Sequence, residues 1–251
     1  MKLHVRVAGR GPDLVLLHGW GMCGNVWRAV SDGLEPHFRV HCVDLPGHGL
    51  SASFTFDHAV ERLSAQLPPR ATVCGWSLGA QLALRWAADM PQQVERLILV
   101  AATPCFVQRA GWEYGMEAAA FDDFARDVAA DPRAALRRFA ALQAHGDTAE
   151  RTVVRELRRH CKQTPPQPAA LAAGLHWLKT TDLRARLPAI GEPALVLHGE
   201  RDPVAPVSAG AWLARSLPVA RLSVFSGAAH APFLSQPSRF VEQVFEFHHE
   251  R

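Results

Sequence analysis

The stretch from Thr72 to Ala83 constrains this chain more than any other part of its sequence. A short apolar run rich in β-forming residues ends in Gly-x-Ser-x-Gly and leads directly into a helical pattern. This is the layout of a nucleophile elbow, a tight strand-to-helix turn with a serine hydroxyl at its apex. We predict that Ser77 lies at the apex, and that a Cβ at Gly75 or Gly79 would strike the neighbouring strand or helix. The helix would also direct its free N–H groups toward the serine.

Strand-like and helix-like segments alternate on both sides of this stretch. Apolar runs predict strands at residues 3–7, 13–17, 39–43, 97–101, 194–198 and 222–225, and helical patterns begin near residues 25, 60, 77, 207 and 237. Such alternation indicates an α/β fold, with a mostly parallel sheet covered by helices on both faces. His18, Asp44 and Ser77 each follow a predicted strand, so we expect them at the carboxyl edge of the sheet, where functional loops gather.

Residues 106–186 interrupt this alternation. Alanine, arginine and leucine dominate there, and about four helical stretches are separated by Pro132, Gly146, Pro165-Pro166 and Gly174. We therefore predict a helical lid inserted into an α/β core formed by residues 1–105 and 187–251. A length of 251 residues suits one large domain with such an insertion.

Composition narrows the class of protein only broadly. Hydrophobic residues make up 48% of the chain, and the formal net charge of +3 is too small to indicate nucleic acid on its own. The five cysteines are scattered without metal-ligand spacing, which favours free thiols in a reducing compartment. No segment has the pattern of a signal peptide or a membrane span. We therefore expect a cytoplasmic enzyme.

Two later residues would complete the chemistry that Ser77 requires. A serine hydroxyl needs a base to take its proton, and the base needs a carboxylate to fix its tautomer. Asp202 follows a late predicted strand and His230 follows the last one, so both would lie at the same edge as the serine. Glu200 and Asp182 are alternative acids in less favourable positions.

Other histidines compete with His230 for the role of base. His18 precedes the elbow and is expected to be a structural loop residue near the site of the oxyanion. His198 lies inside a predicted strand and is expected to be packed there. His230 lies in a Gly-Ala-Ala-His loop, whose small side chains would let the imidazole reach Ser77.

The order serine, acid, histidine resembles the α/β-hydrolase family, and the resemblance extends over essentially the whole chain. It implies an α/β-hydrolase fold in which Ser77, Asp202 and His230 form a catalytic triad. It also implies an oxyanion hole built from the backbone N–H groups of Leu78 and Trp20. This chemistry needs no metal and no organic cofactor. Dehalogenases and epoxide hydrolases carry aspartate at the serine position, so esterases, thioesterases, lactonases, C–C hydrolases and cofactor-free haloperoxidases stay open.

Shorter blocks indicate a narrower resemblance. These blocks are residues 18–22, 26–27, 44–49, 75–79, 104–106 together with Trp112, 139–143 and 229–233. In them the chain is similar to the carboxylesterases of biotin synthesis that cleave pimeloyl-ACP methyl ester. The similarity implies hydrolysis of that ester through an acyl-enzyme on Ser77, with release of methanol. It implies substrate contacts by Trp20, Ser77, Leu78, Phe139, Ala140, Ala141, Leu142, Gln143 and His230.

Arginines crowd the predicted lid, at positions 133, 137, 138, 151, 155, 158 and 159. The last four share one side of a helix, because their spacings are three and four residues. Such a cationic face suits an acidic partner, either a phosphopantetheine phosphate or the acidic helix of an acyl carrier protein, although a merely solvated surface is the simpler interpretation. The resemblance favours carrier-protein docking through Arg138, Arg151 and Arg155. It implies a monomer that binds neither nucleic acid nor membrane.

Two other functions stay open on the sequence alone. The first is a general short-chain carboxylesterase or thioesterase without a preference for carrier-bound acyl groups. The second is a ligand sensor built on the hydrolase fold, against which the intact triad argues.

Overall fold

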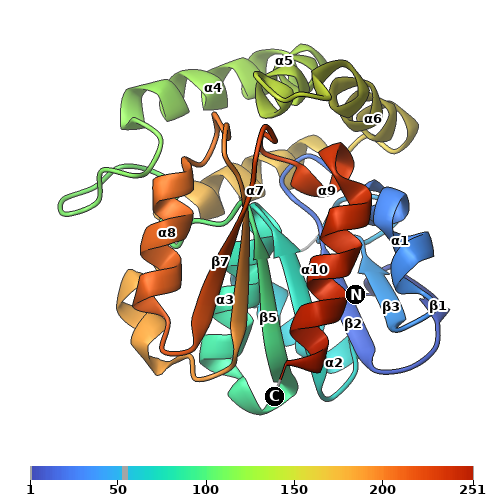
Figure 1. Ribbon diagram of the computed structural model, residues 1–251. Coiled ribbons are helices and arrows are strands. Elements are labelled where there is room, and N and C mark those ends of the chain that lie inside the picture. Colours follow the sequence, from blue (N-terminus) through green and yellow to red (C-terminus); the bar gives the residue numbers. More distant parts are fainter. Residues whose placement is uncertain (1, 53–55, 251) are drawn as a thin grey trace.

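A seven-stranded sheet organises the fold (Figure 1). The computed structural model describes residues 2–52 and 56–250. The strands are β1 (Val5–Gly9), β2 (Asp13–Leu17), β3 (Arg39–Val43), β4 (Ala71–Trp76), β5 (Val94–Val100), β6 (Ala194–Gly199) and β7 (Ala220–Phe225). They lie in the order β1-β3-β2-β4-β5-β6-β7, and only the pairing of β1 with β3 is antiparallel among these described strands. The predicted mostly parallel sheet is confirmed.

Alternate residues of the inner strands pack into two separate hydrophobic cores, because successive side chains of a strand point to opposite faces. In β2, Val15 and Leu17 belong to the core that contains residues of α2 (Ala59–Gln66), α3 (Leu78–Asp89) and α8 (Val207–Ser216). Leu14 and Leu16 belong to the core that contains residues of α1 (Arg28–Leu34) and α10 (Pro237–His249). Both faces are thus buried, which explains the unbroken apolar runs in the sequence.

Four helices lie between β5 and β6 in the chain, and we call them the cap helices. They are α4 (Ala118–Ala130), α5 (Pro132–Ala144), α6 (Glu150–Gln163) and α7 (Pro168–Thr180). In Figure 1, α4, α5 and α6 cross above the carboxyl ends of the strands. Gly174, which was predicted to separate two helices, instead lies inside α7. A Cβ at this position would approach the Trp20 ring to 2.7 Å, so the glycine permits close packing rather than a helix break.

Short elements complete the described chain. They are the 3₁₀ helices η1 (Gly24–Trp27), η2 (Phe56–His58), η3 (Pro91–Gln93) and η4 (Arg184–Ala189), and the one-turn helix α9 (Pro232–Ser235). All five cysteines are free thiols, as predicted. Within residues 2–52 and 56–250, no helix is both long and apolar enough to span a bilayer.

Candidate active site

Ser77 lies at the turn between β4 and α3, and its backbone is strained. Its φ of 55° and ψ of −112° belong to a region that non-glycine residues rarely adopt. A Cβ on Gly75 would lie 2.2 Å from the carbonyl oxygen of Gly79, and one on Gly79 would lie 2.4 Å from that of Leu17. The predicted elbow geometry is therefore confirmed. Strain of this kind typically costs about 1–3 kcal/mol and is found at functional sites.

Asp202 and His230 come together at the carboxyl edge of the sheet. The Nδ1 atom of His230 lies 2.7 Å from Oδ2 of Asp202, and both side chains are buried. A carboxylate only accepts hydrogen bonds, so Nδ1 carries the proton and Nε2 is left as an acceptor. This Nε2 is buried and has no hydrogen-bond partner within the described part of the chain. The imidazole is thus in the tautomer that a general base requires.

The surroundings of Asp202 keep its carboxyl group ionised. Burial by itself would raise the pKa, but the neighbouring imidazoles of His230 and His198 outweigh it, so the pKa lies well below its ordinary value. The other carboxylate oxygen accepts hydrogen bonds from the N–H groups of Val204 and Ala205, at 2.8 and 2.9 Å. His198, expected only to be packed, has Nε2 3.4 Å from Oδ2 of Asp202. No pattern in the sequence indicates this contact, because His198 lies in β6 and Asp202 lies in the loop that follows it.

The loop of His230 is attached directly beside the elbow. The indole N–H of Trp76, the residue before Ser77, donates to the backbone carbonyl of His230 at 2.8 Å. The two alternative acids lie elsewhere. Asp182 forms an ion pair with Arg184 at 2.7 Å, and Glu200 accepts from the N–H of Gly227.

His18 has the structural role that we expected. Its Nε2 accepts a hydrogen bond from the Leu45 N–H at 2.9 Å, and its Nδ1 donates to the Gly19 carbonyl at 2.8 Å. Both ring nitrogens are therefore engaged in holding the loops after β2 and β3.

An apolar cavity of about 180 Å³ opens on Ser77. It is lined by Trp20, Ser77, Phe106, Met116, Ala120, Phe121, Phe124, Phe139, Leu142, Leu175 and Leu178. Apart from the hydroxyl of Ser77, the polar group on its lining side chains is the indole N–H of Trp20, which already donates to the carbonyl of Leu171 at 3.0 Å. The lining therefore favours an uncharged, mostly aliphatic ligand.

The residues predicted to bind the substrate take different positions. Trp20, Phe139 and Leu142 line the cavity. Ala140 belongs instead to the core that contains residues of α1 and α10, and Ala141 is half-buried. Gln143 is buried, and its backbone carbonyl accepts from the His230 N–H at 3.0 Å.

Most of the cavity lining that α4 and α7 contribute was not predicted from the sequence. Phe121 and Phe124 come from α4, and Leu175 and Leu178 come from α7. Helical periodicity indicates that such residues are buried, but it does not indicate that they are buried against a cavity.

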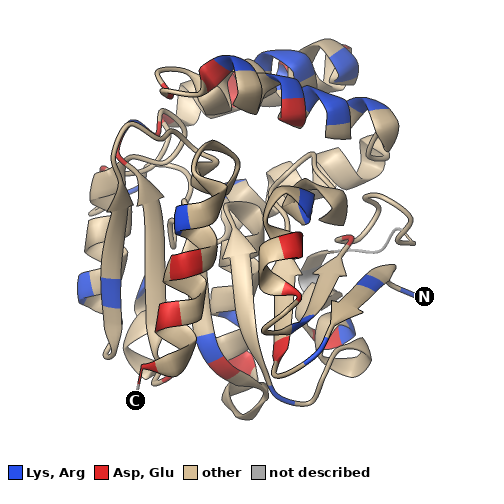
Figure 2. Cartoon of the chain, turned by 45° about the vertical axis from the view of Figure 1, so that its right-hand side comes forward, with Lys and Arg blue, Asp and Glu red and all other residues tan. Residues whose placement is uncertain are grey.

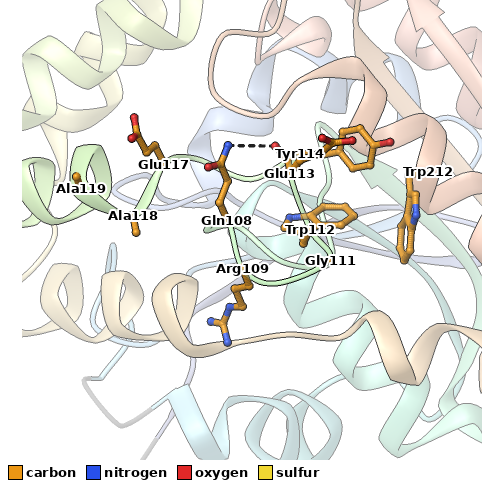
Figure 3. Close-up of a pocket in the computed structure, with 10 residues that line it drawn as sticks. All are labelled: Gln108, Arg109, Gly111, Trp112, Glu113, Tyr114, Glu117, Ala118, Ala119 and Trp212. Carbon is orange, nitrogen blue, oxygen red and sulfur yellow. Dashed lines mark hydrogen bonds between the residues drawn. The ribbon is translucent and has the colours of Figure 1, made fainter.

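A larger concavity of about 860 Å³ lies away from this chemistry, along residues 108–119 and Trp212 (Figure 3). Trp112 packs edge-on against Tyr114 and Trp212, with ring centroids 5.2 and 5.0 Å apart. The lining of this concavity does not include Ser77, Asp202 or His230. In the described residues, no three His, Cys, Asp or Glu side chains are grouped as metal ligands.

A protein-family model described as the alpha/beta hydrolase fold matches residues 12–237. The chain therefore belongs to the α/β-hydrolase family. It is 46% identical to the pimeloyl-[acyl-carrier protein] methyl ester esterase of Nitrosomonas europaea, over 96% of this chain and 97% of that protein. It is 45% identical to the enzyme of the same name from Aromatoleum aromaticum, over 90% of this chain and 94% of that protein.

A solved structure shares the fold of this chain. An esterase from Exiguobacterium antarcticum superposes with a TM-score of 0.86 at 26% identity, covering 98% of this chain and 94% of that one. Together the comparisons confirm the predicted α/β-hydrolase fold and the predicted enzyme class, a carboxylic ester hydrolase.

Proposed function

We propose that this protein is a serine carboxylesterase that hydrolyses the methyl ester of pimeloyl-ACP to pimeloyl-ACP and methanol in biotin synthesis. The observation that carries the proposal is the buried His230–Asp202 pair beside the strained Ser77, which faces an apolar cavity. The names of the two relatives, which are similar over nearly their whole length, support the choice of substrate.

In the proposed reaction, Ser77 Oγ attacks the ester carbonyl while His230 Nε2 takes its proton. The bond to the methoxy oxygen then breaks, and His230 returns the proton so that methanol leaves. Water attacks the acyl-enzyme with His230 again acting as base, which releases the carboxylic acid and restores the serine. Asp202 holds the imidazole in its tautomer and stabilises the imidazolium.

We propose that the N–H groups of Leu78 and Trp20 stabilise the oxyanion. Leu78 is the first residue of α3, so its N–H has no acceptor within the helix. The positive end of the helix dipole lies at the same place. Removing one donor of this kind typically lowers turnover on the order of 10²–10³-fold.

The cavity accounts for the choice of an ester over the free acid. Its lining contains no charged side chain that could pair with a carboxylate. A neutral methyl ester enters such a site without losing strong hydration, whereas the product acid would be desolvated without compensation. We propose that Trp20, Phe139 and Leu142 contact the acyl chain, with Ala140, Ala141 and Gln143 supporting them.

The exposed side of the cap helices supports a carrier protein as partner. Figure 2 shows lysine and arginine gathered on these helices. On α6, Arg151, Arg155 and Arg158 are exposed and lie on the side opposite the buried Val153 and Leu157. We call these three arginines the cationic ridge. An acidic protein surface would be attracted to it over about 10 Å at 0.1 M salt.

The three arginines that the resemblance implies for carrier docking differ in whether a carboxylate of this chain already pairs with them. Arg138 forms an exposed ion pair with Asp127 at 2.7 Å, and Arg155 lies 3.6 Å from Glu156. Arg151 has no carboxylate within 4 Å in the described part of the chain. We therefore propose that Arg151 contributes most to carrier docking, because its charge is not already neutralised.

The test compares pimeloyl-ACP methyl ester with p-nitrophenyl butyrate at low and high salt, using the native chain, Arg151→Glu and Arg215→Glu. Arg215 is an exposed arginine of α8, away from the cap, so it controls for the change in net charge. We expect Arg151→Glu to raise the KM for the carrier substrate about tenfold at low salt, because a favourable charge becomes repulsive. Turnover of p-nitrophenyl butyrate should stay unchanged in both variants.

Other outcomes lead to the alternatives. Turnover of the small ester without turnover of the carrier substrate would indicate a general short-chain esterase. Hydrolysis that stops after one turnover would indicate a ligand sensor. We further propose a monomer acting in the cytoplasm, in keeping with the five free thiols.

A further inference from the structure

A buried carboxylate of the cap reaches the loop that carries His230. Asp147 lies in the turn between α5 and α6, and only 6% of its surface is exposed. Its Oδ2 accepts a hydrogen bond from the backbone N–H of Ala229 at 2.7 Å. Its Oδ1 accepts from the N–H of Ala149 and from the hydroxyl of Ser235, both at 2.7 Å.

Neighbouring bonds join the same turn to the loops of both His230 and Asp202. The Thr148 N–H donates to the Gly227 carbonyl at 2.9 Å, and the His230 N–H donates to the Gln143 carbonyl at 3.0 Å. Arg201, next to Asp202, donates to the Gly146 carbonyl at 3.0 Å. Residues 143–148 therefore hold both loops from the cap side.

The histidine loop is fixed through its backbone: the His230 carbonyl accepts from the Trp76 indole, and the Gly227 N–H donates to Glu200. Residues 227–229 are Gly-Ala-Ala, so no polar side chain of their own can hold them. Their backbone donors must find partners, and the charged Asp147 is the partner next to the histidine. A hydrogen bond to a charged acceptor is stronger than one between neutral groups, and a buried donor left unpaired loses its hydration without compensation.

We infer that Asp147 is a positioning residue for His230. By holding the Ala229 N–H, it keeps the imidazole oriented between Asp202 and Ser77 during the proton transfers of both half-reactions. This inference rests on the roles proposed above for Ser77, Asp202 and His230. A displacement of about 1 Å in a catalytic group lowers rates on the order of 10²-fold, so a bond one residue away from the imidazole is expected to matter.

The experiment measures kcat and KM for p-nitrophenyl butyrate in Asp147→Ala, Asp147→Asn and Ser235→Ala. Asp147→Ala removes the acceptor for Ala229, and we expect kcat to fall about 10–100-fold with KM within twofold of the native value. Asp147→Asn keeps one carbonyl oxygen that can accept from Ala229, so it should recover most of kcat. Ser235→Ala removes a bond to Asp147 but leaves the bond to Ala229, so its kcat should stay within threefold of the native value.

Thermal unfolding followed by circular dichroism checks that each variant is folded. If Asp147→Ala does not fold, Asp147→Asn is compared with Asp147→Leu, a shape-related side chain without an acceptor, and only the asparagine should keep kcat. The inference is overturned if a folded variant without the acceptor keeps kcat within threefold, or if only KM changes. Ser77→Ala is measured in parallel. If it stays active, the proposed mechanism itself fails, whereas an inactive Ser77→Ala beside a fully active Asp147→Ala overturns only the role of Asp147.

Discussion

Asp202 is the residue on which the chemistry of the site depends most clearly. Its Oδ2 faces both His230 and His198, while its Oδ1 accepts two backbone N–H groups. The two histidines lower the pKa of the carboxyl group against the effect of burial. The charge is therefore held in place, and in the proposed mechanism the imidazolium that forms on His230 would meet it without reorganisation.

Replacing this carboxylate by an amide removes the negative charge and keeps the shape of the side chain. We expect Asp202→Asn to lower kcat on p-nitrophenyl butyrate on the order of 10³–10⁴-fold, because the amide removes the charge and favours the wrong tautomer of His230. Asp182→Asn is the matched control, since Asp182 pairs with Arg184 near the surface and should leave kcat within twofold. Equal activity in the two variants would contradict the assignment of Asp202 as the acid.

Single residues also mark where prediction from the sequence ends. Asp202 and His230 could be predicted because the carboxyl ends of parallel strands meet at one edge. The contact of His198 with Asp202 could not, because it depends on how the loop after β6 folds back over the end of its own strand. Asp147 gave no signal, since an aspartate in a turn between two helices usually faces water.

At the scale of elements, α4 and α7 separate two apolar spaces. Phe121 and Leu175 line both the cavity at Ser77 and an outer groove of about 300 Å³ between these helices. Phe121 is 1% exposed, so its ring fills the partition. We therefore expect the side chains of this partition to limit the length of acyl chain that fits inside.

Shortening Phe121 should extend the acyl site. We expect Phe121→Val to shift the preference among p-nitrophenyl esters toward longer chains, raising kcat/KM for the decanoate relative to the butyrate about tenfold. Val128→Ala is the control, because Val128 lines only the outer groove and should leave the ratio unchanged. An unchanged ratio in a folded Phe121→Val protein would show that the partition does not limit chain length.

The sequence predicted the positions of the helices and strands better than it predicted what each face of a helix contacts. The predicted strands β2 and β3 match in both bounds, because their apolar runs are bordered by turn residues. The helical character of residues 118–180 was also evident from composition and spacing. The sequence did not indicate which side of α4 and α7 lines the cavity. Amphipathic periodicity identifies a buried face, but it does not identify what that face is buried against.

At the scale of the whole molecule, two buried histidines link stability to pH. Burial lowers the pKa of His18 to about 4. Burial, together with the charge of the neighbouring His18, lowers the pKa of His48 to about 3. Between pH 6.5 and these values, the unfolded chain binds protons that the folded chain does not. The free energy of unfolding therefore decreases as pH falls, by up to about 1.4 kcal/mol per pH unit for each histidine.

This link can be measured by urea unfolding at several pH values between 7 and 5.5, above the ordinary pKa values of Asp and Glu. We expect His48→Gln to show a shallower loss of stability with falling pH than the native chain, because it removes one group that must stay neutral when folded. Slopes are compared rather than absolute values, since the substitution also changes packing. His145→Gln, at an exposed position, should reproduce the native slope. Parallel slopes for the native chain and His48→Gln would show that His48 is protonated alike in both states, and that other groups set the acid limit of the fold.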